Sequence, residues 1–341
     1  MSRPTIADIA RAAGVSNTAV SFALNGRPGV AEPTRDKIMA IAHDMGWTPN
    51  RAARALSTSR VDALGLIITA PYAELARDAF FLQLIAGVER MLAESPVVLV
   101  LKIVESFEDE LTAIRQWHGE SRVDGLILVN PRPEDPRPEL TNRLEIPTVF
   151  IGKPGTNEPF SSVFIDDALV MDTLIEDLAA RGTRRVAYLH SHAHYSHGEA
   201  RLAALRRHRE GLTAIDHGIP SNSITEAHAA IRNFVSMLDL TPATTFVCES
   251  EDLTLATLRA LRDLKIDVPT DAGLVSWESS PGLTLRSPAV STLERSPADM
   301  GEAAVDLLRD MRDKPGPGPR TRELECPRLH ARDTLPANTQ G

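Results

Sequence analysis

The chain has 341 residues, of which 43% are hydrophobic and 24% are charged, and its formal net charge is −9. This length is too great for one ordinary domain, and the composition is typical of a globular protein that folds in water. No apolar run approaches the roughly 20 residues that cross a bilayer, and the first residues lack the apolar segment of a signal peptide, so we expect a cytoplasmic protein without a membrane partner. Two cysteines, Cys248 and Cys326, do not suggest a disulfide framework.

The charge is unevenly distributed along the chain. Residues 1–60 contain eight Arg or Lys and four Asp or Glu, which gives +4, whereas the remainder carries −13. A small basic segment in front of a large acidic body suggests that the basic end contacts a nucleic acid.

Three short helices are predicted within residues 1–49. Thr5 and Asp8 have the spacing of a capping box, Gly14 ends the first helix, and Ser16 can cap the second, which runs to about residue 24. A third helix fits 32–45. Apolar faces are formed by Ile6, Ile9, Ala10, Ala13, Val15, Val20, Leu24, Ile38, Ile41, Ala42 and Met45. The short turn between the first two helices predicts a helix-turn-helix headpiece, and a three-helix module with no DNA role is the alternative.

The segment that follows, residues 50–60, is predicted to be a hinge helix and linker. Arg51 and Arg54 are three residues apart and share a helix face. So short a helix is marginal in isolation. Two copies could fold together in a DNA minor groove, where Leu56 would open a base step.

A resemblance to a known family begins with these elements. The residues are TIADIARAAGVSNTAVSFALNGRPGVAEPTRDKIMAIAHDMGWTPNRAARALSTSRVDALGLII. In pattern the segment resembles the LacI/GalR family of bacterial transcription regulators nearly residue for residue. The resemblance implies a repressor that binds near-palindromic double-stranded operator DNA as a homodimer and is controlled allosterically by a small, carbohydrate-like effector. The DNA contacts that we predict on this basis are Thr5, Ser16, Asn17, Thr18, Ser21, Phe22, Asn25, Arg27, Asn50, Arg51, Arg54 and Leu56.

Phe22 departs from the family pattern, because many members have arginine or another polar residue there. A phenylalanine cannot make the bidentate contact to guanine. It can touch a thymine methyl group or pack back against the headpiece, and we favour the contact to the base.

From about residue 61 to 336, apolar strands alternate with helices. Strands are predicted at 64–69, 97–104, 125–129, 148–152, 162–165, 185–190, 245–249 and 272–277, and helices at 79–94, 108–118, 167–181, 199–209, 225–238, 252–264 and 297–313. This alternation predicts an α/β core with parallel sheets covered on both faces. The elements fall into two sets, which resemble the two lobes of periplasmic binding proteins. The resemblance implies an all-α helix-turn-helix headpiece plus an α/β two-lobed core that is similar to periplasmic binding proteins.

The resemblance also implies where the chain crosses between lobes, namely near 157–161, 287–292 and 320–325. Lobe 1 would comprise 61–158 and 292–321, lobe 2 would comprise 160–288 and 322–336, and 337–341 would form a tail.

Ligands of such folds bind at the carboxyl ends of the strands. By the resemblance, Arg201 would bind effector hydroxyls or a carboxylate, and Phe80 and Phe81 would stack on the effector. Glu251 and Glu278 stand where many members have aspartate, so the extra methylene predicts a different pocket geometry. No cofactor is expected.

Two further signals admit other interpretations. The segment HSHAHYSH contains His190, His192, His194 and His197, which could bind zinc or nickel. We favour a polar loop over the effector, with no metal. The strand-to-helix junctions carry no nucleotide-binding or nucleophile-elbow motif, which argues against an enzyme. A secreted solute-binding protein and a sensor with a vestigial headpiece remain as alternatives.

Overall fold

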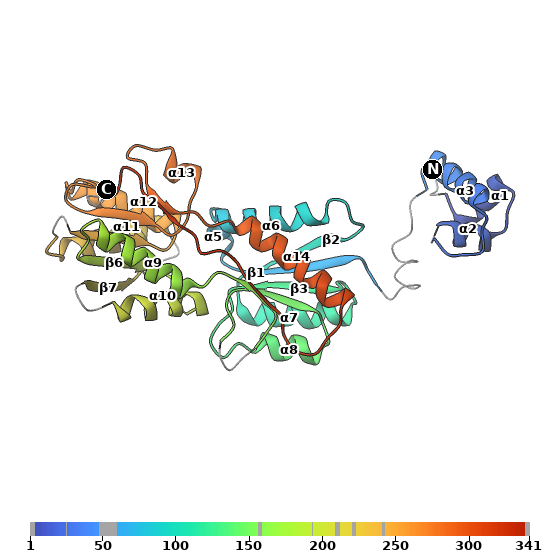
Figure 1. Ribbon diagram of the computed structural model, residues 1–341, viewed down its shortest axis with the longest axis horizontal. Coiled ribbons are helices and arrows are strands. Elements are labelled where there is room, and N and C mark those ends of the chain that lie inside the picture. The colour runs from blue at the N-terminus through green and yellow to red at the C-terminus, as the bar shows by residue number, and fades with distance from the viewer. Residues whose placement is uncertain are drawn as a thin grey trace. The chain divides into compact units, whose positions relative to one another are not determined.

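The computed structural model describes residues 4–24, 26–47, 60–155, 159–192, 194–208, 212–219, 223–240 and 243–337 (Figure 1). It divides into two compact units, Met1–Val61 and Asp62–Gly341, which are called the headpiece and the core below. In these described ranges no helix is both long enough and apolar enough to span a membrane.

The headpiece contains the three predicted helices, α1 (Ile6–Ala13), α2 (Asn17–Leu24) and α3 (Glu32–Asp44). The capping box at the start of α1 is formed: the Asp8 amide donates to the Thr5 hydroxyl at 3.3 Å, and the Thr5 amide donates to the Asp8 carboxylate at 3.0 Å. Gly14 ends the helix in the left-handed conformation, with φ of 71°, which glycine adopts without strain.

A small core joins the three headpiece helices. Its buried residues are Ile9, Ala10, Ala13, Val20, Ala23, Ile38 and Ala42. Ile6 lies at the rim and is 36% exposed, because it begins the first turn of α1. The alanines let the helices approach closely, which is how so short a segment buries enough apolar surface to fold.

The core contains two six-stranded sheets. The elements of the first sheet and its helices are β1 (Ala63–Thr69), α5 (Tyr72–Leu75), α6 (Ala79–Leu92), β2 (Val98–Val104), α7 (Phe107–Gly119), β3 (Gly125–Val129), α8 (Arg137–Arg143), β4 (Thr148–Ile151), β5 (Ser162–Phe164), α14 (Pro297–Asp313) and β11 (Thr321–Glu323). The strand order is β11-β5-β4-β3-β1-β2, and all neighbours are parallel.

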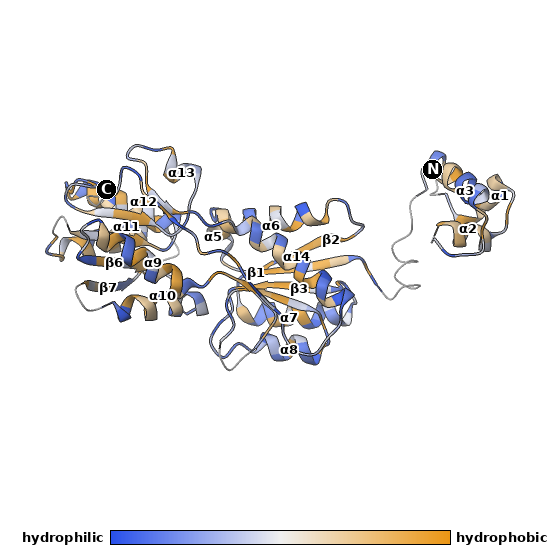
Figure 2. Cartoon of the chain, in the orientation of Figure 1, coloured by the Kyte–Doolittle hydropathy of each residue, from blue (hydrophilic) through white to orange (hydrophobic). Residues whose placement is uncertain are grey.

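The second sheet lies further along the chain. Its elements are α9 (Asp167–Ala180), β6 (Arg185–His190), α10 (Ser196–Arg207), β7 (Thr213–Gly218), α11 (Ile224–Ser236), β8 (Thr244–Cys248), α12 (Glu251–Asp263), β9 (Gly273–Ser276), α13 (Pro281–Thr284), β10 (Ser291–Leu293) and β12 (Leu329–His330). The strand order is β12-β10-β9-β8-β6-β7, and only the β10–β12 pair among these strands is antiparallel. Figure 2 shows apolar strands such as β1 and β3 beside helices with mixed faces, as expected for sheets covered by helices.

The lobe boundaries differ from the prediction. The strand predicted at 162–165 as the first of lobe 2 is β5, which pairs with β4 and β11 in the first sheet. The predicted crossing near 157–161 is therefore wrong, and the chain crosses after β5. Two other boundaries also differ from the prediction. β10 belongs to the second sheet, although the prediction placed residues from 292 onward in lobe 1. β11 belongs to the first sheet, although the prediction placed residues from 322 onward in lobe 2. The reason is pairing between distant segments, since the Ser162 amide donates to the Arg320 carbonyl at 2.9 Å.

Helices α6 and α14 pack backbone to backbone on the first sheet. A Cβ atom at Gly87 would lie 2.0 Å from the carbonyl oxygen of Ala298, and one at Gly301 would lie 2.4 Å from the carbonyl oxygen of Leu84. Only glycine permits this approach, so the two helices form one closely packed pair.

Candidate functional site

The first turn of α2 presents polar side chains on the headpiece surface. The Ser16 hydroxyl caps the helix by accepting from the Ala19 amide at 3.2 Å, while Asn17 and Thr18 are exposed beside it. The Thr5 hydroxyl also donates to the Asp8 carboxylate at 2.7 Å. Thr5 and Ser16 therefore have structural roles as caps, and Asn17 and Thr18 are the groups most open to a partner.

Phe22, also on α2, is partly buried. Two of its ring carbons lie 3.4 and 3.7 Å from where a Cβ of Gly29 would be, and Gly29 has a φ of 111°. Gly29 is thus a partner for packing of Phe22 against the headpiece, which is the less favoured of the two roles predicted for this residue. Ser21, the neighbouring predicted contact, is also partly buried.

Basic side chains flank α2. The side chain of Arg27 is exposed, and its carbonyl oxygen accepts from the Arg35 guanidinium at 2.8 Å. Lys37 donates to the Ala13 carbonyl at 3.0 Å, at the negative end of the α1 dipole. Arg35 and Lys37 therefore hold turns of the headpiece, whereas the Arg27 side chain remains available to phosphates. The other predicted DNA contacts, Asn25, Asn50, Arg51, Arg54 and Leu56, lie outside the described residues.

A cavity of about 700 Å³ lies in the core, where strands of both sheets end. Thr69, Asn130 and Gly152 line it from the first sheet, and Ser191 and Glu249 line it from the second. Carboxyl ends of parallel strands are the usual ligand position in open α/β folds, and this volume suits a small molecule.

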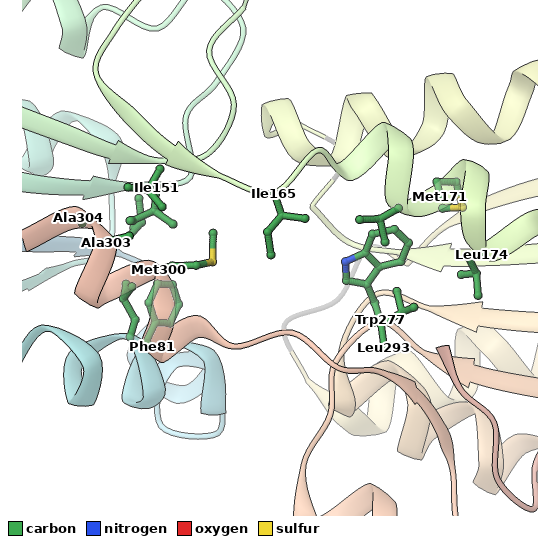
Figure 3. Packing of buried hydrophobic residues seen from close by; sticks show 14 of the residues in the cluster. Phe81, Ile151, Ile165, Met171, Leu174, Trp277, Leu293, Met300, Ala303 and Ala304 are labelled. Atoms are coloured by element: carbon green, nitrogen blue, oxygen red, sulfur yellow. The ribbon is translucent and has the colours of Figure 1, made fainter. Parts of the chain in front are cut away.

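Figure 3 shows buried apolar side chains in this part of the core. Phe81, Ile165 and Met300 line the cavity, and Trp277 and Leu293, on the side of the second sheet, belong to the same buried cluster.

Arg201, the predicted effector ligand on α10, lies at the centre of a buried ion network. Arg201 Nε donates to Asp167 Oδ1 at 2.8 Å, and Nη2 lies 2.7 Å from the same oxygen. Nη1 lies 3.5 Å from Glu249 Oε1. It also lies 4.2 Å from the ring centroid of Trp277. The cleft wall therefore fixes Arg201 in place before any ligand arrives.

Charge pairing decides the protonation of this network. Burial alone would raise the pKa of Asp167, but the positive charges of Arg201 and Arg295 outweigh it and lower that pKa. Glu249 behaves in the same way: burial opposes ionisation, but hydrogen bonding to His192 and the charge of Arg201 hold its pKa below the usual range. Both carboxylates are therefore ionised at neutral pH.

The two predicted aromatic contacts also line the cavity, at the start of α6. The rings of Phe80 and Phe81 are edge to face, with centroids 5.3 Å apart. Apolar ring faces at a cleft edge suit stacking on the apolar face of a sugar or another ring.

The predicted glutamates line the cavity as well. The Glu278 carboxylate accepts from the Glu251 amide at 3.2 Å. Burial and the charge of Asp78 raise the pKa of Glu278 to about 7. Glu251 does not pair with Arg201; that role belongs to Glu249, two residues earlier.

The histidine segment forms part of the cleft wall. His192, His194 and His197 line the cavity, and His192 Nδ1 lies 3.5 Å from Glu249. Burial lowers the pKa of His197 to about 3, so it is neutral. Across the described ranges, no three His, Cys, Asp or Glu side chains are arranged to hold a metal ion.

Several cavity residues were not predicted. Asp167 and Glu249 hold Arg201, Arg295 lines the cavity between β10 and α14, and Arg77 Nε donates across the cleft to Asp252 at 2.9 Å. A charged residue at the last position of a predicted strand was the available signal for Glu249. Arg77 and Arg295 lie in connecting segments, where no periodicity marks a side chain as facing a cleft.

Comparisons with known proteins cover both units. A model described as "Bacterial regulatory proteins, lacI family" matches residues 5–50, and one described as "Periplasmic binding protein-like domain" matches 175–335. The HTH-type transcriptional regulator CelR of Thermobifida fusca is 28% identical over 90% of this chain and 92% of its own length. MalR of Staphylococcus xylosus is 26% identical over 89% of each. These relatives are transcriptional regulators and not enzymes, as the sequence predicts for this chain.

Solved structures agree in fold. The Lac repressor dimer bound to operator and the anti-inducer ONPF has a TM-score of 0.82 at 20% identity, and covers 98% of this chain and 100% of that one. The CelR–cellobiose complex has a TM-score of 0.70 at 24% identity, and covers 97% and 100%. The predicted combination of a helical headpiece and a two-lobed α/β core is confirmed.

Proposed function

Because the chain belongs to the lacI family of bacterial regulatory proteins, we propose that it is a cytoplasmic repressor whose affinity for operator DNA is controlled by a small molecule bound in the core cavity. The observation that carries this proposal is that one chain joins a helix-turn-helix unit to a cleft lined by aromatic and charged side chains. An effector that binds one arrangement of the lobes better shifts the equilibrium between DNA-competent and incompetent forms.

In the headpiece, we propose that α2 lies in the major groove with Asn17 and Thr18 toward base edges. An asparagine can read adenine through two hydrogen bonds. Arg27 would contact phosphate, and Phe22 would present the exposed part of its ring beside the bases. The hinge at 50–60 would follow, with Arg51 and Arg54 at phosphates and Leu56 in the minor groove.

The effector that we propose is a sugar or a related polyhydroxylated metabolite. Phe80 and Phe81 offer ring faces, and the Arg201 network and Glu278 offer donors and acceptors for hydroxyl groups. The solved CelR structure is described as a complex with cellobiose, and this supports trying cellobiose first.

We further propose a homodimer, which would place two headpieces on a near-palindromic operator. Exposed apolar side chains on lobe 1 support a homodimer. Leu82 on α6 is 71% exposed, and Leu101 on β2 is 42% exposed. On lobe 2, Leu285 is 84% exposed. Light scattering should give twice the chain mass, and Leu82→Glu should weaken the dimer.

A mobility-shift titration of the full chain on the DNA upstream of its own gene tests the proposal. Wild type should bind specifically at moderate salt, and an effector should change the affinity. Asn17→Ala should reduce specific binding at least tenfold, whereas the exposed Ala40→Ser on α3 should not. The proposal fails if a folded dimer gives no specific shift.

A further inference from the structure

Arg295 occupies a position that joins the two lobes. It follows β10 of the second sheet and precedes Ser296, whose hydroxyl caps α14 on the first sheet. Its side chain lines the cavity and is only partly exposed. A group held by Arg295 is therefore held at a segment that connects the two lobes.

The other two arginines of the cavity are neutralised by protein carboxylates. Arg201 pairs with Asp167 and Glu249, and Arg77 pairs with Asp252. Such pairing satisfies most of the donors that each guanidinium carries.

The side chain of Arg295 differs from both. Throughout the ranges that the structure describes, its side chain makes no hydrogen bond and no ion pair, and its Cζ lies 6.0 Å from the centroid of the Phe80 ring. Burial lowers the pKa of Arg295, and the charges of Asp167 and Glu278, which lie beyond ion-pair distance, do not fully offset this loss of hydration. Unsatisfied donors in a partly desolvated site favour a ligand that supplies acceptor oxygens.

The other charged groups of the cavity indicate which kind of ligand oxygen would bind Arg295. The carboxyl groups of Asp78, Glu251 and Glu278 also line it, so acids outnumber the unpaired cation. An anionic ligand would be repelled by these groups, and a positive group placed next to the Arg295 guanidinium would be repelled by that guanidinium. Uncharged hydroxyl groups can accept from the guanidinium and donate to the carboxylates at the same time.

We propose that Arg295 is a specificity-determining residue that donates two hydrogen bonds to neighbouring oxygens of an uncharged, polyhydroxylated effector. This inference rests on the proposed effector role of the cavity and refines its ligand class. The planar guanidinium fork suits two adjacent oxygens, which a lysine cannot bind in the same way.

The test is calorimetric and thermal-shift titration of the full-length protein with a panel of neutral mono- and disaccharides that includes cellobiose and maltose, together with D-glucuronate and D-glucosamine. The best neutral sugar should bind Arg295→Ala at least tenfold more weakly than wild type, and Arg295→Lys should lose a large part of the affinity despite its charge. Arg122→Ala, which removes an exposed arginine outside the cavity, is the matched control and should bind as wild type. The urea midpoint of each variant should stay near that of wild type, which separates lost binding from lost folding.

The outcomes distinguish the two proposals. If a neutral sugar binds and Arg295→Ala retains its affinity within twofold, the assignment of Arg295 is wrong while the effector role of the cavity stands. If D-glucuronate or D-glucosamine binds more tightly than every neutral sugar, the inferred ligand class is wrong. If no member of the panel binds, the sugar effector of the proposed function fails, and the inference fails with it.

Discussion

The close contact between α6 and α14 gives the sharpest structural prediction. Replacing Gly87 with alanine puts a methyl group 2.0 Å from the Ala298 carbonyl oxygen, where ordinary contacts begin at 3.4 Å. The obstacle is backbone, which cannot rotate away as a side chain can, so the helices must separate. Overpacking typically costs 1–3 kcal/mol, and the better helix propensity of alanine returns up to about 1 kcal/mol. Because the obstructing atom is backbone, we place the cost at the upper end of this range and expect a net loss of about 2 kcal/mol in the free energy of unfolding.

Urea denaturation followed by tryptophan fluorescence measures this loss, because Trp117 and Trp277 are buried in the core. The same variant should bind effector more weakly, since Phe81 on α6 and Met300 on α14 line the cavity. Gly119→Ala is the control: it lies at the end of α7, and its Cβ would meet nothing within 4 Å, so its stability should be equal or higher. A Gly87→Ala protein that unfolds within 0.5 kcal/mol of wild type would refute the backbone-to-backbone packing.

Three further predictions concern charged groups. Because the pKa of Glu278 is raised to about 7 in the folded state, the folded protein keeps a proton between about pH 4.5 and 7 that the unfolded chain releases. The free energy of unfolding should therefore fall as the pH rises through this window. Glu278→Gln should therefore be more stable than wild type at pH 8 and as stable as wild type near pH 4.5. Urea titrations at both pH values test this, and an equal difference in the free energy of unfolding at the two pH values would contradict it. Arg201→Met leaves Asp167 and Glu249 unpaired and should cost about 3–5 kcal/mol in urea denaturation, with recovery when both acids become amides. Lys37→Met removes a charge from the end of α1 and should destabilise the headpiece by about 0.5 kcal/mol, and an unchanged melting curve would show that this bond contributes nothing.

The sequence by itself determined the local elements and the resemblance to the lacI family. Thr5 with Asp8, Gly14 and the apolar stripe on α3 specify the headpiece, because capping and helical periodicity act between residues only a few positions apart. Alternating strands and helices likewise sufficed for an α/β core with parallel sheets, since buried parallel strands are continuous apolar runs, and the resemblance to a known family supplied the division into two lobes. The helix α13 was missed because four residues are too few to show a period, and β7 was missed because its sequence, TAIDHG, contains no apolar run.

Tertiary structure alone decided where the lobes divide and what fills the cleft. The lobe that holds β5 is set by its hydrogen bonds to β11, more than 150 residues away, and no local pattern encodes that pairing. Arg201 could be assigned to the cavity, but its pairing with Asp167 and Glu249 could not. Whether the Arg295 donors have a protein partner depends on the distances between its guanidinium and the surrounding carboxylates, and only the folded chain sets those distances.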